Sequence, residues 1–217
     1  CIRDRCSDDD TSPLYVACYS SNIECLKILI ENGADINKCC NDDTSPLFIA
    51  CQYNNFECLK ILIENGAYIN KCRVGEFSPL YITCENNNIE CAKILIANGA
   101  DINKFTCDKN SLLHVSCHFD NIECINILIK SNLNIYLKNT YNETAFYISH
   151  ENDFKHTILK FLQNGINIKY ELQNAPNIIN CMNNYSYEKY IKKLNKYRKT
   201  ELKLKYEFMN IICSNNS

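Results

Sequence analysis

The sequence is short of the residues on which several classes of protein depend. It contains no tryptophan, five glycines and four prolines in 217 residues. No window reaches the roughly 18 consecutive apolar residues needed to cross a bilayer, and the N-terminus has neither a basic start nor a signal-like apolar stretch. No glycine-rich loop or paired-carboxylate arrangement stands out. The sequence therefore gives no indication of a membrane-spanning, secreted or phosphate-binding protein.

A strong net charge is also missing from the chain as a whole. Its formal charge of −2 is too small to predict a polyanionic partner. The charge is unevenly distributed, because residues 186–213 hold eight Lys or Arg residues and three Glu residues, a net charge of +5. Tyr190, Leu194, Tyr197 and Leu204 follow helical spacing in this segment. We therefore expect a basic amphipathic helix near the C-terminus.

The most informative feature that is present is a repeat with a period of 33 residues. One slot holds proline in three units and an apolar residue in two, and a small residue follows four positions later. The first slot is filled by Pro13, Pro46, Pro79, Leu112 and Ala145. The small slot is filled by Ala17, Ala50, Thr83, Ser116 and Ser149. Within a unit, as in residues 11–37, apolar residues follow helical spacing in two halves, which predicts two short helices per unit.

Polar residues and glycines mark where these helices should begin and end. A hydroxyl side chain precedes each first helix and can cap it; these residues are Ser12, Ser45, Ser78, Ser111 and Thr144. Between the helices, a residue that tolerates left-handed backbone angles and caps the second helix is expected; these residues are Asn22, Asn55, Asn88 and Asn121. A glycine should end the second helix, with Asn132 in its place in the fourth unit; the glycines are Gly33, Gly66, Gly99 and Gly165.

The sequence resembles the ankyrin repeat family over residues 11–169. The segments TSPLYVAC, TSPLFIAC, FSPLYITC and NSLLHVSC are similar to the family signature TPLHxAA, and ENGADIN at 31–37 is similar to the end of its second helix. Two departures are clear. The signature histidine survives only as His114, with Tyr or Phe in the other units, and the glycine between the helices is mostly asparagine.

This resemblance implies an all-α fold, an ankyrin repeat solenoid of helix-turn-helix units joined by hairpin loops. Residues 11–173 would hold five repeats, and residues 1–10 would be the loop remnant of a preceding repeat. Residues 174–217 would form a degenerate sixth repeat that ends in the basic capping helix. A terminal unit of this kind is expected to be atypical, because its outer face meets water.

The sixteen cysteines fall mostly into repeat slots. The first helices carry Cys18, Cys51, Cys84 and Cys117, and the second helices carry Cys25, Cys58, Cys91 and Cys124. The family has small apolar residues at these slots, so we expect the cysteines to pack in the core. Equivalent cysteines on packed helices would lie too far apart for disulfides. The loop cysteines are Cys6, Cys39 and Cys72, with Cys40 and Cys107 nearby. Redox or metal chemistry is conceivable there, but the chain has no CxxC pair of the kind that zinc sites use.

A catalytic role for these cysteines would require a histidine partner. His114 fills the structural histidine slot of the family, and His118 lies where the first helix should be exposed. We therefore expect no catalytic residues, no cofactor and no bound metal.

The resemblance also implies a binding surface. Loop tips and the outer positions of the first helices would form one extended concave face, on which exposed aromatic residues are the usual anchors of a protein interface. On the first helices the expected partner-binding residues are Tyr19, Gln52, Tyr53, Glu85, His118 and Phe119. On the loops they are Asp42, Asp43, Arg73, Phe77 and Phe105.

The sequence thus predicts a non-catalytic scaffold, a monomer in the cytoplasm of a cell, that binds another protein through this face and takes no small-molecule substrate. The alternative is an adaptor that also recruits effector machinery, such as a ubiquitin ligase, through its C-terminal helix. For that helix three interpretations stay open, namely a cap on the last repeat, a contact with an anionic membrane or nucleic acid, and a docking site for a second partner.

Overall fold

A computed structural model describes residues 11–131, 133–152 and 154–166, together with Glu171, Lys192, Lys196 and Lys199. The three lysines are helical and exposed. The predictions for the loop remnant 1–10, for Asn132 and for the rest of the C-terminal unit 174–217 lie outside the described residues.

The described residues form ten helices and no strand, which confirms the all-α prediction. The first helices of the five units are α1 (Pro13–Tyr19), α3 (Pro46–Gln52), α5 (Pro79–Glu85), α7 (Leu112–His118) and α9 (Ala145–Glu151). The second helices are α2 (Ile23–Glu31), α4 (Phe56–Glu64), α6 (Ile89–Ala97), α8 (Ile122–Lys130) and α10 (Lys155–Gln163).

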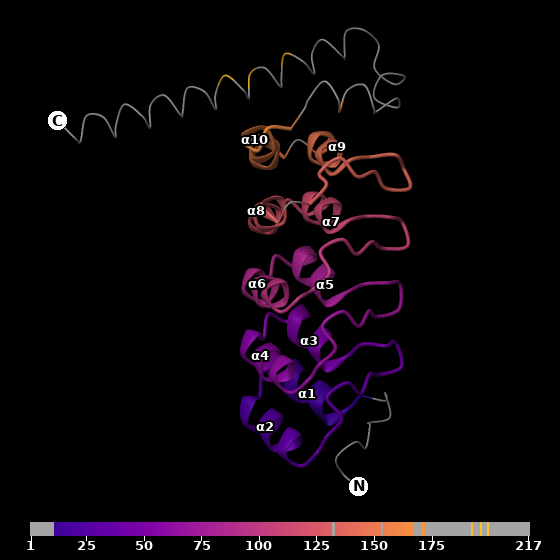
Figure 1. Ribbon diagram of the computed structural model, residues 1–217, viewed down its shortest axis with the longest axis vertical. Coiled ribbons are helices and arrows are strands. Elements are labelled where there is room, and N and C mark those ends of the chain that lie inside the picture. Colours follow the sequence, from indigo (N-terminus) through magenta and orange to yellow (C-terminus); the bar gives the residue numbers. More distant parts are fainter. Residues whose placement is uncertain are drawn as a thin grey trace, which may run out of the picture.

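The five helix pairs stack in a single column (Figure 1). The odd-numbered helices form one row and the even-numbered helices form a second row beside it, while the connecting loops project from the side of the first row. Isolated antiparallel bridges, such as Arg73 to Phe77 and Phe105 to Ser111, give these loops their hairpin form. Each unit therefore buries its apolar surface against the units before and after it.

The predicted starts of the first helices are confirmed. The hydroxyls of Ser12, Ser45, Ser78, Ser111 and Thr144 each accept a hydrogen bond from the backbone N–H three residues later. Proline occupies the first helical position of α1, α3 and α5, where its missing N–H costs no hydrogen bond. The capping hydroxyl and, where present, the proline therefore explain, from the local sequence alone, where these helices begin.

The turn between the two helices differs from the prediction. The asparagines Asn22, Asn55, Asn88 and Asn121 have negative φ angles between −80° and −87°. The residue that adopts the left-handed conformation is the one before each of them; these residues are Ser21, Asn54, Asn87 and Asp120, with φ between 53° and 56°. The prediction of left-handed angles was thus wrong by one position, because the backbone reverses direction before the cap residue and not at it.

The predicted capping role of these asparagines holds only for Asn22, whose Oδ1 accepts from the Cys25 N–H at 3.0 Å. The other three side chains bond to the preceding unit. Asn88 Nδ2 donates to the carbonyls of Cys51 and Gln52 at 2.9 and 3.1 Å, and Asn121 Nδ2 donates to the equivalent carbonyls one unit later. Asn55 bonds to the Cys18 carbonyl in the same manner. These side chains satisfy carbonyl groups at the end of one first helix from the next unit.

The core runs along the whole column. Every residue of the small slot is buried, with 2% or less of its surface exposed. On the second helices, Leu62, Leu95 and Leu128 occupy one slot and are at most 1% exposed. Phe146 and Phe161 close the core at α9 and α10, with ring centroids 5.6 Å apart.

The predicted glycines end the second helices in the left-handed conformation, as at Gly66 with φ 85°. A Cβ built on Gly66 would meet no atom within 4 Å, so a side chain there would strain only the backbone. We expect Gly66→Ala to lower the free energy of unfolding by about 1 to 2 kcal/mol in urea denaturation. The control is Glu64→Ala, at an exposed helical position, and equal losses in both variants would contradict this explanation.

Candidate functional site

The outer ends of the first helices form a surface that we call the first-helix face. It consists of the last residue and the C-cap residue of each first helix, namely Tyr19, Ser20, Gln52, Tyr53, Glu85, Asn86, His118, Phe119, Glu151 and Asn152. Tyr19, Tyr53 and Phe119 are 54%, 47% and 48% exposed. Because the first helices stack in one row, residues 33 or 34 positions apart come to lie beside each other.

The aromatic residues of this face are held in defined positions. The rings of Tyr19 and Tyr53 meet edge to face with centroids 4.7 Å apart, although they come from neighbouring units. His118 and Phe119 make a similar contact, with ring centroids 5.1 Å apart, at the C-terminal end of α7. Such contacts restrict the side chains before a partner binds, which lowers the entropy that binding would cost.

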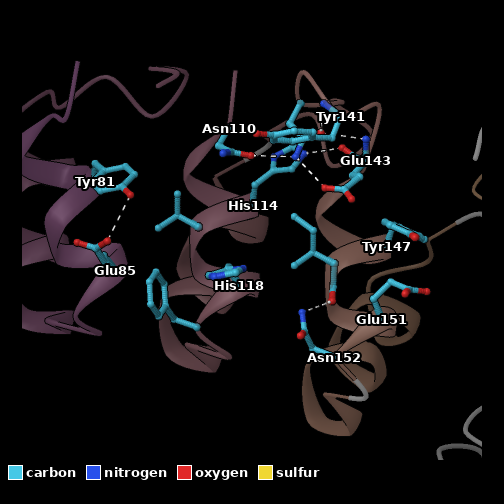
Figure 2. A pocket seen from close by; sticks show the side chains of 14 residues that line it. Tyr81, Glu85, Asn110, His114, His118, Tyr141, Glu143, Tyr147, Glu151 and Asn152 are labelled. Atoms are coloured by element: carbon cyan, nitrogen blue, oxygen red, sulfur yellow. Dashed lines mark hydrogen bonds between the residues drawn. The ribbon is translucent and has the colours of Figure 1, made fainter. Parts of the chain in front are cut away.

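A groove of about 480 Å³ opens on the first-helix face between α5, α7 and α9 (Figure 2). Its walls are made by residues of three first helices, namely Tyr81 and Glu85 on α5, His114, Val115, His118 and Phe119 at α7, and Tyr147, Ile148, Glu151 and Asn152 at α9. The loop residues Tyr141 and Glu143 close it above. Three predicted partner-binding residues, Glu85, His118 and Phe119, therefore line one groove.

A hydrogen bond orders the α5 wall of this groove. The Tyr81 hydroxyl lies 3.3 Å from Glu85 Oε1 and donates to it. Burial of the ring and the nearby Glu85 carboxylate raise the pKa of Tyr81 to about 12. The phenol therefore stays protonated at neutral pH and keeps its donor.

The upper end of the groove is fixed by His114, which lies beside Asn110 and Glu143 (Figure 2). Its Nδ1 accepts from the Ser111 N–H at 3.3 Å, so its Nε2 carries the proton and donates to the Glu143 carbonyl at 2.9 Å. Burial lowers the pKa of His114, which favours this neutral form. The side chain thus ties α7 to the following loop, and it has the structural role that the sequence predicted.

The loop residues Asp42 and Arg73 bind each other instead of standing free. Arg73 Nη2 lies 2.6 Å from Asp42 Oδ2, and Asp42 Oδ1 also accepts from the Cys40 thiol and the Thr44 N–H. Partial burial of Asp42 opposes ionisation, but these hydrogen bonds and the Arg73 charge outweigh it and lower the pKa of Asp42 to about 2. The pair joins two successive loops.

The other predicted loop residues differ in how accessible they are. Asp43 is paired with Lys71 at 3.3 Å, and Phe105 is 38% exposed beside its bridge to Ser111. Phe77 is partly buried, since its ring packs against the core and against Tyr81 at 4.7 Å between centroids. Arg73, Phe77, Tyr81 and Glu85 line a smaller pocket of about 120 Å³ beside the main groove.

Sequence reasoning missed several residues of the groove, above all Tyr81, Tyr141, Glu143 and Tyr147. A signal was available for two of them. Tyr81 and Tyr147 stand in the slot of His114, where the family signature has histidine. Tyr141 and Glu143 come from a loop with no repeated pattern, so only the fold could bring them to the groove.

The cysteines of the repeat slots are buried, with one exception. Cys58, Cys91 and Cys124 are at most 1% exposed, and the thiols of Cys91 and Cys124 face carbonyls of the preceding unit. Cys25, in the same slot, is exposed, so the prediction of a core position was wrong for it. The reason is that α2 stands at the end of the described column and has no earlier described helix against it.

This difference predicts unequal reactivity toward a thiol reagent. Burial raises the pKa of Cys91 and of Cys117 to about 12, so these thiols are both protonated and covered. In the native protein we expect Cys25 and the exposed Cys107 to be alkylated roughly 100-fold faster or more than Cys91 and Cys117, as measured by mass spectrometry. Rapid native-state labelling of Cys91 would instead indicate an accessible, reactive thiol.

Two kinds of feature are absent from the part of the chain that the structure describes. No three or more His, Cys, Asp or Glu residues there are grouped so that they could hold a metal ion. No helix in the same part is long and apolar enough to span a bilayer.

Comparison with known proteins agrees with the stacked helix pairs. A family model described as ankyrin repeats in three copies matches residues 2–73 and 80–172. A search of curated proteins found no match. Members of the matched family are generally protein–protein interaction modules and are typically non-catalytic. With more than half of its length matched, the chain belongs to the ankyrin repeat family.

Proposed function

We propose that this protein is a non-catalytic scaffold that binds one partner protein through its first-helix face. The observation that carries the proposal is the row of exposed aromatic side chains, Tyr19, Tyr53 and Phe119, on a rigid stack of helices. Aromatic residues dominate the binding energy of most protein interfaces, because they bury a large area and lose little side-chain entropy.

The geometry of the face supports the same proposal. The two aromatic pairs described above hold their rings in place, and the groove between α5 and α9 offers a recess beside Phe119 into which a partner side chain could fit. Of the loop residues, Phe105 is the best remaining candidate for contact. Asp42, Asp43, Arg73 and Phe77 have partners within the protein and would contribute less.

We further propose that the protein acts as a monomer in a reducing compartment such as the cytoplasm. Every cysteine of the described residues is free, although exposed Cys25 and Cys107 could be oxidised outside a cell.

The adaptor alternative is supported by the +5 charge of residues 186–213. Deleting residues 186–217 separates the two functions, because an adaptor keeps its target and loses its effector.

The test of the scaffold function is affinity capture from a matched cell extract with the parent protein and with a Tyr19→Ala, Tyr53→Ala, Phe119→Ala variant. We expect the variant to lose at least about 2 kcal/mol of binding free energy, roughly 30-fold in affinity, for the captured partner. Circular dichroism and thermal melting establish that the variant is folded.

A matched control replaces three exposed, large apolar side chains that lie outside the first-helix face. Ile28, Phe56 and Tyr68 are exposed to similar degrees, and none belongs to the first-helix face. The variant with alanine at these three positions should capture the partner as well as the parent does. If the two triple variants bind alike, recognition lies in the loops or in the C-terminal segment, and the first-helix face is not the interface.

A further inference from the structure

The residues that line the groove between α5, α7 and α9 indicate the charge of the partner side chain that the groove would bind. We propose that it receives an arginine or lysine side chain from a basic segment of the partner protein. The inference rests on the proposed function, because it names what binds in this groove of the first-helix face. Its support is the combination of a recess, aromatic walls and carboxylates that have no Lys or Arg partner among the described residues.

The charge of the groove is acidic on both sides. Glu85 on α5 and Glu151 on α9 lie on either side of His118, with Glu143 at the upper edge (Figure 2). The described residues that line the groove include no lysine and no arginine. Among the described residues, neither Glu85 nor Glu143 belongs to an ion pair, and the pair of Glu151 with His150 is long, at 3.8 Å. A cation entering the groove would therefore meet carboxylates that are not already neutralised by Lys or Arg.

The walls of the groove also offer aromatic rings, against which a long cationic side chain can pack. The rings of Tyr81, Phe119, Tyr141 and Tyr147 line the groove. Aromatic faces attract guanidinium and ammonium groups, and they also pack against the methylene stems of arginine and lysine. A neutral apolar side chain would leave the carboxylates desolvated, and an acidic one would be repelled by them.

The protein itself provides an internal example of such an occupant. One unit before the groove, the guanidinium of Arg73 lies over the ring of Phe48, 6.0 Å from its centroid, and pairs with Asp42. Tyr81, His114 and Tyr147 occupy the repeat slot of Phe48, but Thr106 and Asn139 occupy the slot of Arg73. The pocket beside Arg73 measures about 120 Å³, whereas the groove, without such an arginine, measures about 480 Å³.

Helix stability does not explain the two acids on the helices. Glu85 and Glu151 are the last residues of α5 and α9, where the carbonyl groups of the last turn already carry partial negative charge. A carboxylate at this end is unfavourable for the helix. Replacing either acid by glutamine should therefore leave the melting temperature unchanged or raise it, so that a loss of binding in these variants cannot be attributed to unfolding.

The experiment uses a fluorescein-labelled peptide of alternating arginine and serine, and a second peptide with glutamine at each arginine. Fluorescence anisotropy would measure binding of both peptides to the full chain. We expect saturable binding of the arginine peptide and none of the glutamine peptide. Glu85→Gln with Glu151→Gln should weaken binding about ten-fold, as expected for the loss of two partly exposed charge pairs.

Two further variants locate the effect. Glu90→Gln with Glu123→Gln removes the same charge from exposed positions in the first turns of α6 and α8 and should bind the peptide within about two-fold of the parent. His118→Arg places a cation of the protein's own between Glu85 and Glu151 and should block the peptide. In the parent, the peptide should shift the amide NMR signals of residues 81–85, 114–119 and 141–152.

No saturable binding of the arginine peptide would overturn the inference, and so would equal losses in the two double-glutamine variants. Failure of this inference can be distinguished from failure of the proposed function. If the partner protein is lost by the Tyr19, Tyr53 and Phe119 variant but retained by both His118→Arg and the Glu85, Glu151 variant, the first-helix face is the interface and the groove does not receive a cation.

Discussion

Leu62→Ala should lower the free energy of unfolding by about 2 to 5 kcal/mol, the largest single effect that we expect in the repeat stack. Leu62 lies on α4 and is fully buried in the core that the successive units share. Its truncation removes apolar contacts and leaves a cavity that close-packed neighbours cannot fill. Because typical domains are stable by only about 5 to 15 kcal/mol, the loss would be readily measured by urea denaturation.

The repeat supplies a matched control for this substitution. Leu29 occupies the same slot on α2 but is only partly buried, because α2 has no earlier described helix against it. Leu29→Ala removes the same atoms and should therefore be clearly milder. A loss as large at position 29 as at position 62 would mean that the packing between units contributes little at this slot.

Asn88→Ala is expected to destabilise the protein by about 1 to 3 kcal/mol. The side chain makes two hydrogen bonds, to the carbonyls of Cys51 and Gln52 at the end of α3, and thus joins one unit to the preceding one. Alanine would leave these carbonyls without their donor in a partly buried position, where water replaces it poorly. The variant should also unfold faster, since the lost bonds hold two units together.

Asn86→Ala tests whether any asparagine at this junction has the same effect. Asn86 Nδ2 donates to the same Gln52 carbonyl at 3.2 Å, but this bond is exposed to solvent. Water can take its place, so we expect a loss below about 0.5 kcal/mol. If both variants lost equal stability in chemical denaturation, the two-bond arrangement of Asn88 would not be the cause.

The candidate site could be predicted from the sequence only in part. The repeat period places Tyr19, Tyr53 and Phe119 at the ends of first helices, and all three are exposed there. The period does not reveal which polar side chains find partners. Asp42 and Arg73 look like two free loop charges in the sequence, yet they form a close ion pair because successive loops lie side by side.

What the sequence by itself determined is the local structure. The hydroxyl caps, the prolines at the first helical position and the glycines after the second helix act within a few residues, so their effects can be inferred without knowing the neighbours. The exact period of 33 residues then implies that units of similar structure stack. For these reasons the all-α repeat fold was predictable.

Only the tertiary structure determined the contacts between units. Asn88 was expected to cap its own helix and instead bonds to the unit before, 36 and 37 residues away. Cys25 and Cys58 share a slot but not an environment, and the groove takes its walls from three different units. The exposure and the hydrogen-bond partners of a side chain depend on what packs against it, and stacking supplies those neighbours from distant parts of the chain.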